Sequence, residues 1–268
     1  METPPLAIET ALEVARVAGA IQRRGWGHPG EPSSKAADVD LVTEFDGLCE
    51  AAIVDGLRAR FPDHAILGEE GGARPGDARF RWVVDPLDGT VNFAHGLPLF
   101  SVSVALQVDG ETALGVVLAP VLGWEFVATR GGGATLNGQP IRVSRQASLA
   151  RALLVTGFPY DRRTSPENNF DHFVAFQLGA GAVRRLGAAS LDLCFVACGW
   201  LDGYWEMKLS PWDVAAGELI VREAGGRTSD FSGGRPRPES IVASNGLFHD
   251  AMLAVLQADA TRPAPARG

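Results

Sequence analysis

The stretch "RWVVDPLDGTVNFAHGLPLF", residues 81–100, decides how the rest of this chain is interpreted. An apolar strand runs directly into two carboxylates, Asp85 and Asp88. A buried strand that ends in acids and turn formers has reached either solvent or a charged ligand. Pro86 fixes one backbone dihedral angle and Gly89 relieves another, so the turn can point both carboxylates toward one place. This arrangement favours a charged ligand.

Composition limits the possible partners. With 268 residues and 46% apolar content, the chain can bury one large core or two smaller ones. The net charge of -8 argues against a general nucleic-acid or anionic-membrane surface, so a bound anion would need local arginines or a metal ion. Three cysteines without a CxxC pair predict reduced thiols, and no secretory leader is recognised. We therefore expect a cytoplasmic enzyme.

The first part of the chain predicts two helices followed by antiparallel strands. Thr3 and Pro4 are expected to open a helix that ends near Gly25, and Thr43 is expected to cap a helix after a loop at 27–40. The apolar side of the first helix is expected to contain Leu6, Leu12, Val14, Val17 and Ile21. Beyond residue 80, alternating apolar residues and the turn pairs Asp109-Gly110 and Asn137-Gly138 predict hairpins.

Beyond about residue 150, strands alternate with helices, which favours a sheet covered by helices. We expect two domains: residues 1–145, with two helices and an antiparallel sheet, and residues 146–258, of alternating type. Residues 259–268 are expected to form a disordered tail.

Acids gather at the ends of the predicted elements. The four groups are Asp38, Asp40 and Asp46; Glu69 and Glu70; Asp85 and Asp88; and Asp213. Asp46 follows Thr43 by three residues and Asp213 follows Ser210 by three, so each can complete a helix capping box without any chemical role. The pair at 85 and 88 is harder to explain in that way.

Mg²⁺ prefers oxygen ligands and is usually held by a few carboxylates together with substrate phosphate. Asp85, the Leu87 carbonyl and Asp88 can supply such a site. The following "GTVN" can open a short helix whose N–H groups at Gly89 and Thr90 face an anion.

Four motifs, "DPLDGTVNFAHGLPLFSVSVAL", "ILGEEGG", "DLVTEFD" and "WEMKLSPWDVAAGELIVREAGG", together resemble the inositol monophosphatase family of Mg²⁺-dependent, lithium-sensitive phosphatases. The resemblance runs from about Ala11 to Leu256. It implies a mixed α/β fold, the layered αβαβα sandwich that this family shares with fructose-1,6-bisphosphatase. The active site is then expected between the two halves of the chain.

The resemblance also implies roles for individual residues. The first metal would be held by Glu69, Asp85 and the Leu87 carbonyl, and the second by Asp85, Asp88 and Asp213; a third Mg²⁺ would lie near Glu69 through water. Gly89 and Thr90 would bind phosphate, and Asp46 would pair with Thr90 to activate the attacking water. The expected catalytic residues are thus Glu69, Thr90 and Asp46, and the expected contacts to substrate are Asp88, Gly89, Thr90, Ala189, Glu206 and Asp213.

These roles predict hydrolysis of a small phosphomonoester, with myo-inositol monophosphate as the leading substrate. Histidinol phosphate and fructose 1,6-bisphosphate are alternatives, ahead of NADP and 3'-phosphoadenosine nucleotides. The alternative class is a binding protein for a metal or phospholigand that lacks turnover. Lys208 departs from the small residue of animal relatives, so its role and that of the loop at 158–173 stay open. A homodimer is expected, in which Arg184 and Arg185 can reach a neighbouring site, without nucleic-acid or membrane partners.

Overall fold

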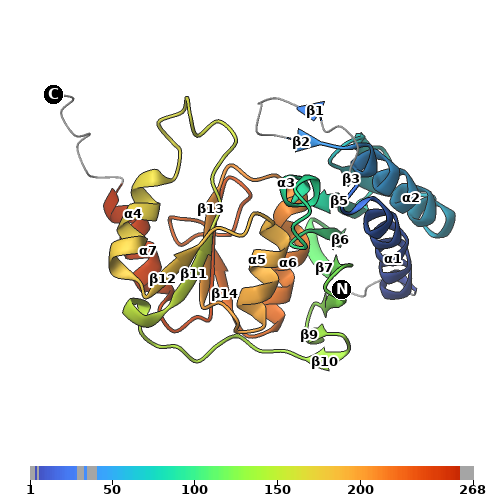
Figure 1. The fold of residues 1–268 in the computed structure, drawn as a ribbon. Coiled ribbons are helices and arrows are strands. Elements are labelled where there is room, and N and C mark those ends of the chain that lie inside the picture. Colours follow the sequence, from blue (N-terminus) through green and yellow to red (C-terminus); the bar gives the residue numbers. More distant parts are fainter. Residues whose placement is uncertain (1–3, 5, 29–32, 35–40, 260–268) are drawn as a thin grey trace.

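The computed structural model describes residue 4 and residues 6–28, 33–34 and 41–259. Its elements stack in five layers (Figure 1): α1 with α2, an eight-stranded sheet, α5 with α6, a five-stranded sheet, and α4 with α7. The helices are α1 (Ala7–Gly25), α2 (Glu44–Arg60), α3 (Thr90–Ala94), α4 (Phe170–Gly179), α5 (Ala189–Ala197), α6 (Pro211–Glu223) and α7 (His249–Asp259). This order confirms the predicted αβαβα sandwich.

The larger sheet has the strand order β10-β9-β8-β7-β6-β5-β3-β4. Its strands are β3 (His64–Gly68), β4 (Gly72–Arg74), β5 (Asp77–Asp88), β6 (Ser101–Val108), β7 (Glu111–Ala119), β8 (Trp124–Thr129), β9 (Gly133–Leu136) and β10 (Gln139–Pro140). Both predicted hairpin turns are confirmed, since β6 pairs antiparallel with β7 and β9 with β10. The pair β3 and β5 is parallel, with Gly68 opposite Val84. Two strands therefore end at the same edge of the sheet.

The α1–α2 layer packs largely through small residues. The predicted apolar side of α1 is confirmed for Leu12, Val14 and Ile21, which pack on the core, and is wrong for Leu6 and Val17. Leu6 and Val17 are 55% and 46% exposed. The buried side contains Ala7, Thr10, Ala11, Val14, Ala15, Ala18, Gly19, Gln22 and Gly25. A Cβ on Gly19 would lie 2.9 Å from Leu118 Cδ2, so the helix lies too close to the sheet for large side chains. The predicted start is also wrong, because Leu6 occupies the N-cap position; Thr3 lies outside the described residues.

The middle layer joins the two sheets. Helices α5 and α6 bury apolar residues from both halves of the chain in one core, which includes Val83 and Val117 from the first half and Leu193 and Leu219 from the second. A Cβ on Gly115 of β7 would lie 2.8 Å from the Ala216 carbonyl oxygen of α6. Glycine at this position therefore lets α6 rest directly on the larger sheet.

The smaller sheet has the order β12-β11-β13-β15-β14. Its strands are β11 (Leu153–Thr156), β12 (Ala182–Arg184), β13 (Gly203–Met207), β14 (Arg227–Ser229) and β15 (Ser240–Ser244). All were predicted except β14, which is three residues long and has no apolar alternation. The strand β11 lies parallel to β12 and β13, whereas β15 is antiparallel to β13 and β14. The larger sheet ends at Pro140 of β10 and the smaller sheet begins at Leu153 of β11. The predicted domain boundary between residues 145 and 146 lies between these strands and stays a prediction.

The predicted loop at 27–40 and the predicted tail at 259–268 differ in part from the structure. Part of the predicted loop at 27–40 is wrong, because β1 (Ser33–Ser34) pairs antiparallel with β2 (Leu41–Val42). Asp38 and Asp40 lie outside the described residues. The tail prediction is wrong at Asp259, which ends α7, and its other residues also lie outside the description.

The state of the cysteines and the length and polarity of the helices test two further expectations. All three cysteines are free thiols; Cys49 and Cys194 are buried and Cys198 is half-buried. In the part of the chain that the structure describes, every helix is too short or too polar to span a bilayer.

The close approach of α6 to the sheet can be tested with Gly115→Ala. The added Cβ meets backbone atoms of Ala216, which cannot rotate away, so we expect a loss of about 1–3 kcal/mol in the free energy of unfolding. Urea denaturation measures it. The matched control is Gly47→Ala in α2, where nothing lies within 4 Å of the new Cβ; it should be neutral or stabilise by up to about 1 kcal/mol. Equal stability of the two variants would contradict the packing account.

Candidate active site

The opening motif forms an irregular end to β5. Pairing between β5 and β6 shifts register between Asp85 and Asp88, and the Leu87 N–H donates to Asp85 Oδ1 over 3.0 Å. Gly89 follows with φ 90°, and a Cβ there would lie 2.9 Å from the Leu99 carbonyl oxygen. Glycine is therefore required both by the left-handed backbone and by the space. The turn brings two acids of one strand to the same edge of the sheet, as the spacing predicted.

Glu69 reaches this edge because β3 runs parallel to β5. Gly68 lies opposite Val84, so the next residues of the two strands are Glu69 and Asp85. The buried Glu50 of α2 holds the turn after Glu69. Its two carboxylate oxygens accept hydrogen bonds from the N–H groups of Glu70 and Gly71, each over 2.7 Å. Sequence reasoning missed Glu50, since one acid in a helix carries no recognisable signal.

Asp46 completes the capping box that its spacing predicted and also lies beside Thr90, as the family resemblance implied. Its Oδ2 accepts hydrogen bonds from the Thr43 N–H over 2.8 Å and the Thr43 hydroxyl over 2.7 Å, which completes the capping box of α2. Its Oδ1 lies 3.1 Å from the Thr90 Oγ1, within hydrogen-bond distance. Thr90 Oγ1 also lies 3.0 Å from the Leu87 carbonyl oxygen. One buried carboxylate therefore fixes a helix start and orients the hydroxyl of Thr90.

Asp213 likewise caps α6 and faces the site. Its Oδ2 accepts a hydrogen bond from the Ser210 N–H over 2.7 Å, while its other oxygen accepts none from the described residues. Burial raises the pKa of Asp213 well above its usual value; the Ser210 hydrogen bond opposes this, and the charges of Asp88 and Glu69 add to it. Capping and a place in the acid cluster are compatible.

Asp88 is held by the start of α5. The N–H groups of Ala189 and Ser190 donate to its carboxylate over 3.1 and 2.8 Å, and the Ser190 hydroxyl donates over 2.5 Å. Burial raises the pKa of Asp88, and these bonds partly counter the increase. Ala189 was predicted to contact substrate through its backbone, and in this structure its N–H donates to Asp88 instead. Ser190 is a further site residue that the sequence did not indicate.

The acids form one electrostatic group. Burial raises the pKa of Asp85 well above its usual value, and the nearby charges of Glu69, Asp88 and Asp213 raise it further. Among the described residues, Asp85, Asp88 and Asp213 form no salt bridge with lysine or arginine. A group of buried carboxylates without cationic partners is costly unless protons or metal ions neutralise it.

The acid group has the kind of oxygen atoms that bind Mg²⁺. Carboxylate and carbonyl oxygens of the kind that Mg²⁺ prefers lie at this edge of the sheet. A divalent cation among them would neutralise the charges by which the carboxylates repel one another. Within residues 6–28, 33–34 and 41–259, however, no three His, Cys, Asp or Glu side chains stand ready to hold one ion together. Asp88 and Asp213 instead turn oxygens toward helix N–H groups. The assigned metal ligands therefore stay predictions.

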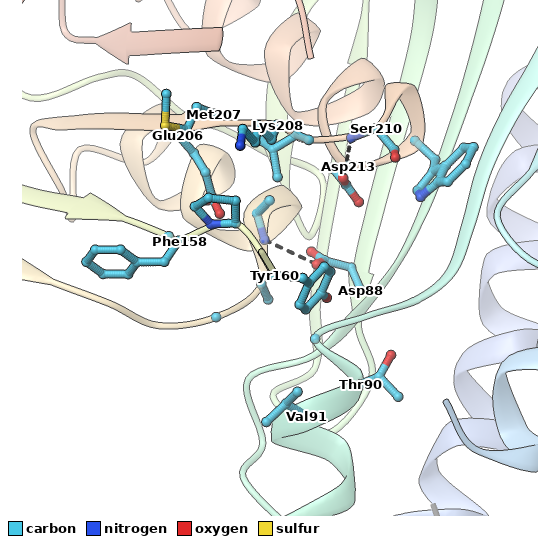
Figure 2. Close-up of a pocket in the computed structure, with 18 of the residues that line it drawn as sticks. Asp88, Thr90, Val91, Phe158, Tyr160, Glu206, Met207, Lys208, Ser210 and Asp213 are labelled. Carbon is cyan, nitrogen blue, oxygen red and sulfur yellow. Dashed lines mark hydrogen bonds between the residues drawn. The ribbon is translucent and has the colours of Figure 1, made fainter. Parts of the chain in front are cut away.

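The acids open into a cavity of about 320 Å³ (Figure 2). Its lining includes Glu69, Asp88 and Asp213 together with Gly89, Thr90, Ala189 and Glu206, so the residues predicted to contact substrate share one space. Arg185 and Lys208, whose roles the sequence left open, also line it. Phe158, Tyr160 and Trp212 are aromatic residues that also line the cavity, and the sequence assigned no role to any of them.

Glu206 projects from β13 into this cavity. Its Oε2 accepts a hydrogen bond from the buried Tyr204 hydroxyl over 2.8 Å. Burial raises the pKa of Glu206 to about 7, against the opposing effects of Tyr204 and Arg185. A Cβ at residue 157 would overlap the carboxylate, so Gly157 makes room for it. The arrangement leaves one carboxylate oxygen able to accept hydrogen bonds from a ligand.

Acids from both halves of this layered αβαβα protein line one cavity, and its relatives identify the protein as a phosphoric monoester hydrolase. The chain belongs to the Inositol monophosphatase family, whose model matches residues 6–261.

Relatives and solved structures agree with this assignment. The "Inositol-1-monophosphatase" of Synechocystis is 45% identical, over 94% of this chain and 88% of that protein. The "Nus factor SuhB" of Pseudomonas aeruginosa is 46% identical, over 93% of this chain and 95% of its own. The structure of inositol monophosphatase from Anabaena superposes with a TM-score of 0.86 at 40% identity, covering 94% of this chain and 95% of that one.

Asp213→Asn separates helix capping from the role in the acid cluster. Asparagine can still accept the Ser210 N–H bond and carries no charge into the acid cluster, so the free energy of unfolding of the metal-free protein should be no lower than that of the wild type. Losing the charge should lower kcat by about 100-fold or more, because even residues that only support metal ligands cost 10- to 100-fold. Urea unfolding and phosphate release measure the two effects. An unchanged kcat would leave Asp213 as a helix cap alone.

Proposed function

We propose that this phosphatase hydrolyses small phosphomonoesters of polyols, with myo-inositol monophosphate as the leading substrate and Mg²⁺ as cofactor. The observation that carries the proposal is the cavity, whose lining includes Asp88 at the end of β5, Glu69, Asp213 and the carboxylate of Glu206. A phosphate beside the acids would leave its alcohol facing Glu206. The family and the name of the Synechocystis relative support the same substrate.

Mg²⁺ would be held by Glu69, Asp85 and the Leu87 carbonyl at one position, and by Asp85, Asp88 and Asp213 at another. A third ion would lie near Glu69. Bound there, Mg²⁺ would neutralise charge on the phosphoryl oxygens, lower the pKa of a bound water and stabilise the leaving oxygen. Burial and repulsion support the assignment, because Glu69 and Asp88 raise the pKa of both Asp85 and Asp213.

The protein's own groups would orient the reactants. The N–H groups of Gly89 and Thr90 at the cavity wall would donate hydrogen bonds to phosphate oxygens. Thr90 would direct its own hydroxyl proton to Asp46 Oδ1, which leaves its oxygen free to accept a hydrogen bond from the attacking water. Asp46 would thereby hold the proton that Thr90 contributes and keep the hydroxyl in one orientation.

The polyol would be recognised at the far side of the cavity. Because Tyr204 occupies Oε2 of Glu206, Oε1 is left to accept a hydrogen bond from a substrate hydroxyl. Two neighbouring hydroxyls on a small ring suit such an acceptor together with the adjacent backbone. Histidinol phosphate and fructose 1,6-bisphosphate are alternative substrates, while NADP and 3'-phosphoadenosine nucleotides are less suited to a cavity of about 320 Å³.

Further parts of the proposal come from the family resemblance and the composition of the chain. They are lithium sensitivity, a cytoplasmic location, and a homodimer with its exposed Arg184 and Arg185 near the neighbouring subunit. The partner would be a small phosphorylated metabolite, without nucleic acid or membrane. The alternative of a binding protein without turnover is disfavoured, because the chain belongs to a phosphatase family and retains every predicted acid ligand.

Phosphate release across a substrate panel tests the proposal. The panel contains inositol 1-phosphate, histidinol phosphate, fructose 1,6-bisphosphate, NADP and 3'-phosphoadenosine 5'-phosphate, each with Mg²⁺ and with EDTA. We expect release that requires Mg²⁺, favours inositol 1-phosphate, and falls by about 100-fold or more in Asp88→Asn. Equal rates in EDTA, or full activity of Asp88→Asn, would refute the metal assignment. A preference for another ester would reassign the substrate and leave the chemistry unchanged.

Thr90→Val tests the orienting hydroxyl. Valine keeps the shape and removes the oxygen, so kcat should fall by about 10²- to 10⁴-fold while the Mg²⁺ concentration at half-maximal rate stays nearly constant. Val91→Ala, at another lining residue of the cavity, is the control. The reverse pattern, a nearly normal kcat with weakened Mg²⁺ dependence, would count against the role of Thr90.

A further inference from the structure

The segment 157–168, between β11 and α4, covers one side of the cavity. Phe158, Pro159 and Tyr160 of this segment contribute to its lining (Figure 2). Asn169 fixes the far end of the segment: its amide donates to Thr156 Oγ1 over 2.9 Å and to the Gly157 carbonyl over 2.6 Å. Both ends of the segment are therefore joined at their base. The tip of the segment, residues 161–165, is held by a separate contact.

Lys208 holds the tip. Its ammonium group lies 2.8 Å from Asp161 Oδ2 and donates a hydrogen bond to Ser165 Oγ over 2.9 Å. The N–H groups of Thr164 and Ser165 both donate to the Asp161 carbonyl over 2.9 Å, which closes residues 161–165 into a compact turn. Lys208 thus binds the first and last residues of that turn. The side chains of Lys208 and Asp161 are 29% and 48% exposed, so the ion pair between them can open and reform.

The backbone of Lys208 is unusual in a way that serves this contact. Lys208 has φ 57°, a left-handed conformation that glycine adopts at little cost and a lysine adopts at some. It follows directly after β13, between Glu206 and the capping residue Ser210 of α6 (Figure 2). Its N–H donates to the Glu239 carbonyl over 3.0 Å, which secures the turn. Since the backbone alone would favour glycine, the lysine side chain is the feature that needs an explanation.

We propose that Lys208 is a specificity-determining positioning residue, which holds segment 157–168 against the cavity and so restricts the alcohol part of the substrate to small groups. The proposal rests on the proposed function, because it concerns the alcohol end of the same site. Phe158 and Tyr160 form the wall that the bridge keeps in place. Loss of the bridge should let the wall move outward, which admits larger alcohols and weakens contacts to small ones.

Two variants remove the bridge from opposite sides. Lys208→Met keeps the length of the side chain without its charge, and Asp161→Asn removes the partner charge. Glu167→Gln is the matched control, an exposed acid of the same segment that makes no contact with Lys208 among the described residues. The double variant Lys208→Met, Asp161→Asn tests whether the two residues act through one contact.

The first readout is trypsin cleavage at Arg162 and Arg163 in the native protein, which needs no turnover. Because an exposed ion pair changes an equilibrium by up to about fivefold, we expect cleavage to be about two- to fivefold faster in either single variant. The double variant should be no faster than the singles, and Glu167→Gln should match the wild type. Unchanged cleavage in Lys208→Met and Asp161→Asn would overturn the bridge.

The second readout is the ratio of kcat/KM for inositol 1-phosphate to that for the bulkier adenosine 2'-monophosphate. Loss of the bridge should lower this ratio about two- to fivefold, mainly through a higher KM for inositol 1-phosphate with kcat retained. An unchanged ratio would overturn the specificity role even where cleavage is faster. Absence of any phosphate release by the wild type would refute the proposed function, while the cleavage comparison would still decide the bridge.

Discussion

Repulsion among buried carboxylates is the constraint on which this structure depends. Two unit charges 4 Å apart in a protein site of effective dielectric 20 repel by about 4 kcal/mol, and four acids gather here: Glu69, Asp85, Asp88 and Asp213. The fold brings them together at a cost that packing elsewhere must offset. Parallel pairing of β3 with β5, the irregular end of β5 and the close approach of α6 over Gly115 each deliver one part of the group. Such an arrangement is stable only if positive charge enters it.

The protein limits the cost by giving several of these acids a second function. Asp46 and Asp213 complete the capping boxes of α2 and α6, and Asp88 accepts N–H groups at the start of α5. Helix N-termini carry partial positive charge, so each bond stabilises the ionised acid as well as the helix. The capping role of these acids is therefore observed and is compatible with a chemical role. An acid that fixes a helix start is also held rigidly, as a group that positions a reactant must be.

The sequence predicted most helices and strands from local signals, whereas the resemblance to the family implied the five layers and a site between the two halves of the chain. Strand alternation, turn pairs and capping spacings act over a few residues, and the clustered acids carried the family resemblance. The face of α1 was predicted only in part, because the close approach of two layers selects alanine and glycine at many buried positions, which apolar periodicity does not reveal. Glu50, Ser190 and the bridge of Lys208 to Asp161 depend on contacts between distant parts of the chain, so no local pattern indicated them.

The most direct test is calorimetric titration of the metal-free protein with Mg²⁺ at pH 7, repeated in buffers that differ in ionisation enthalpy. Burial raises the pKa values of Asp85, Asp88 and Asp213, and neighbouring charges raise those of Asp85 and Asp213 further, so Mg²⁺ should compete with protons for the group. We predict Mg²⁺ binding with a net release of protons, seen as heat that changes with the buffer. Absence of Mg²⁺ binding would contradict the claim that the acids at the end of β5 form a cation site, and binding whose heat is the same in every buffer would contradict the claim that burial and repulsion keep protons on the group.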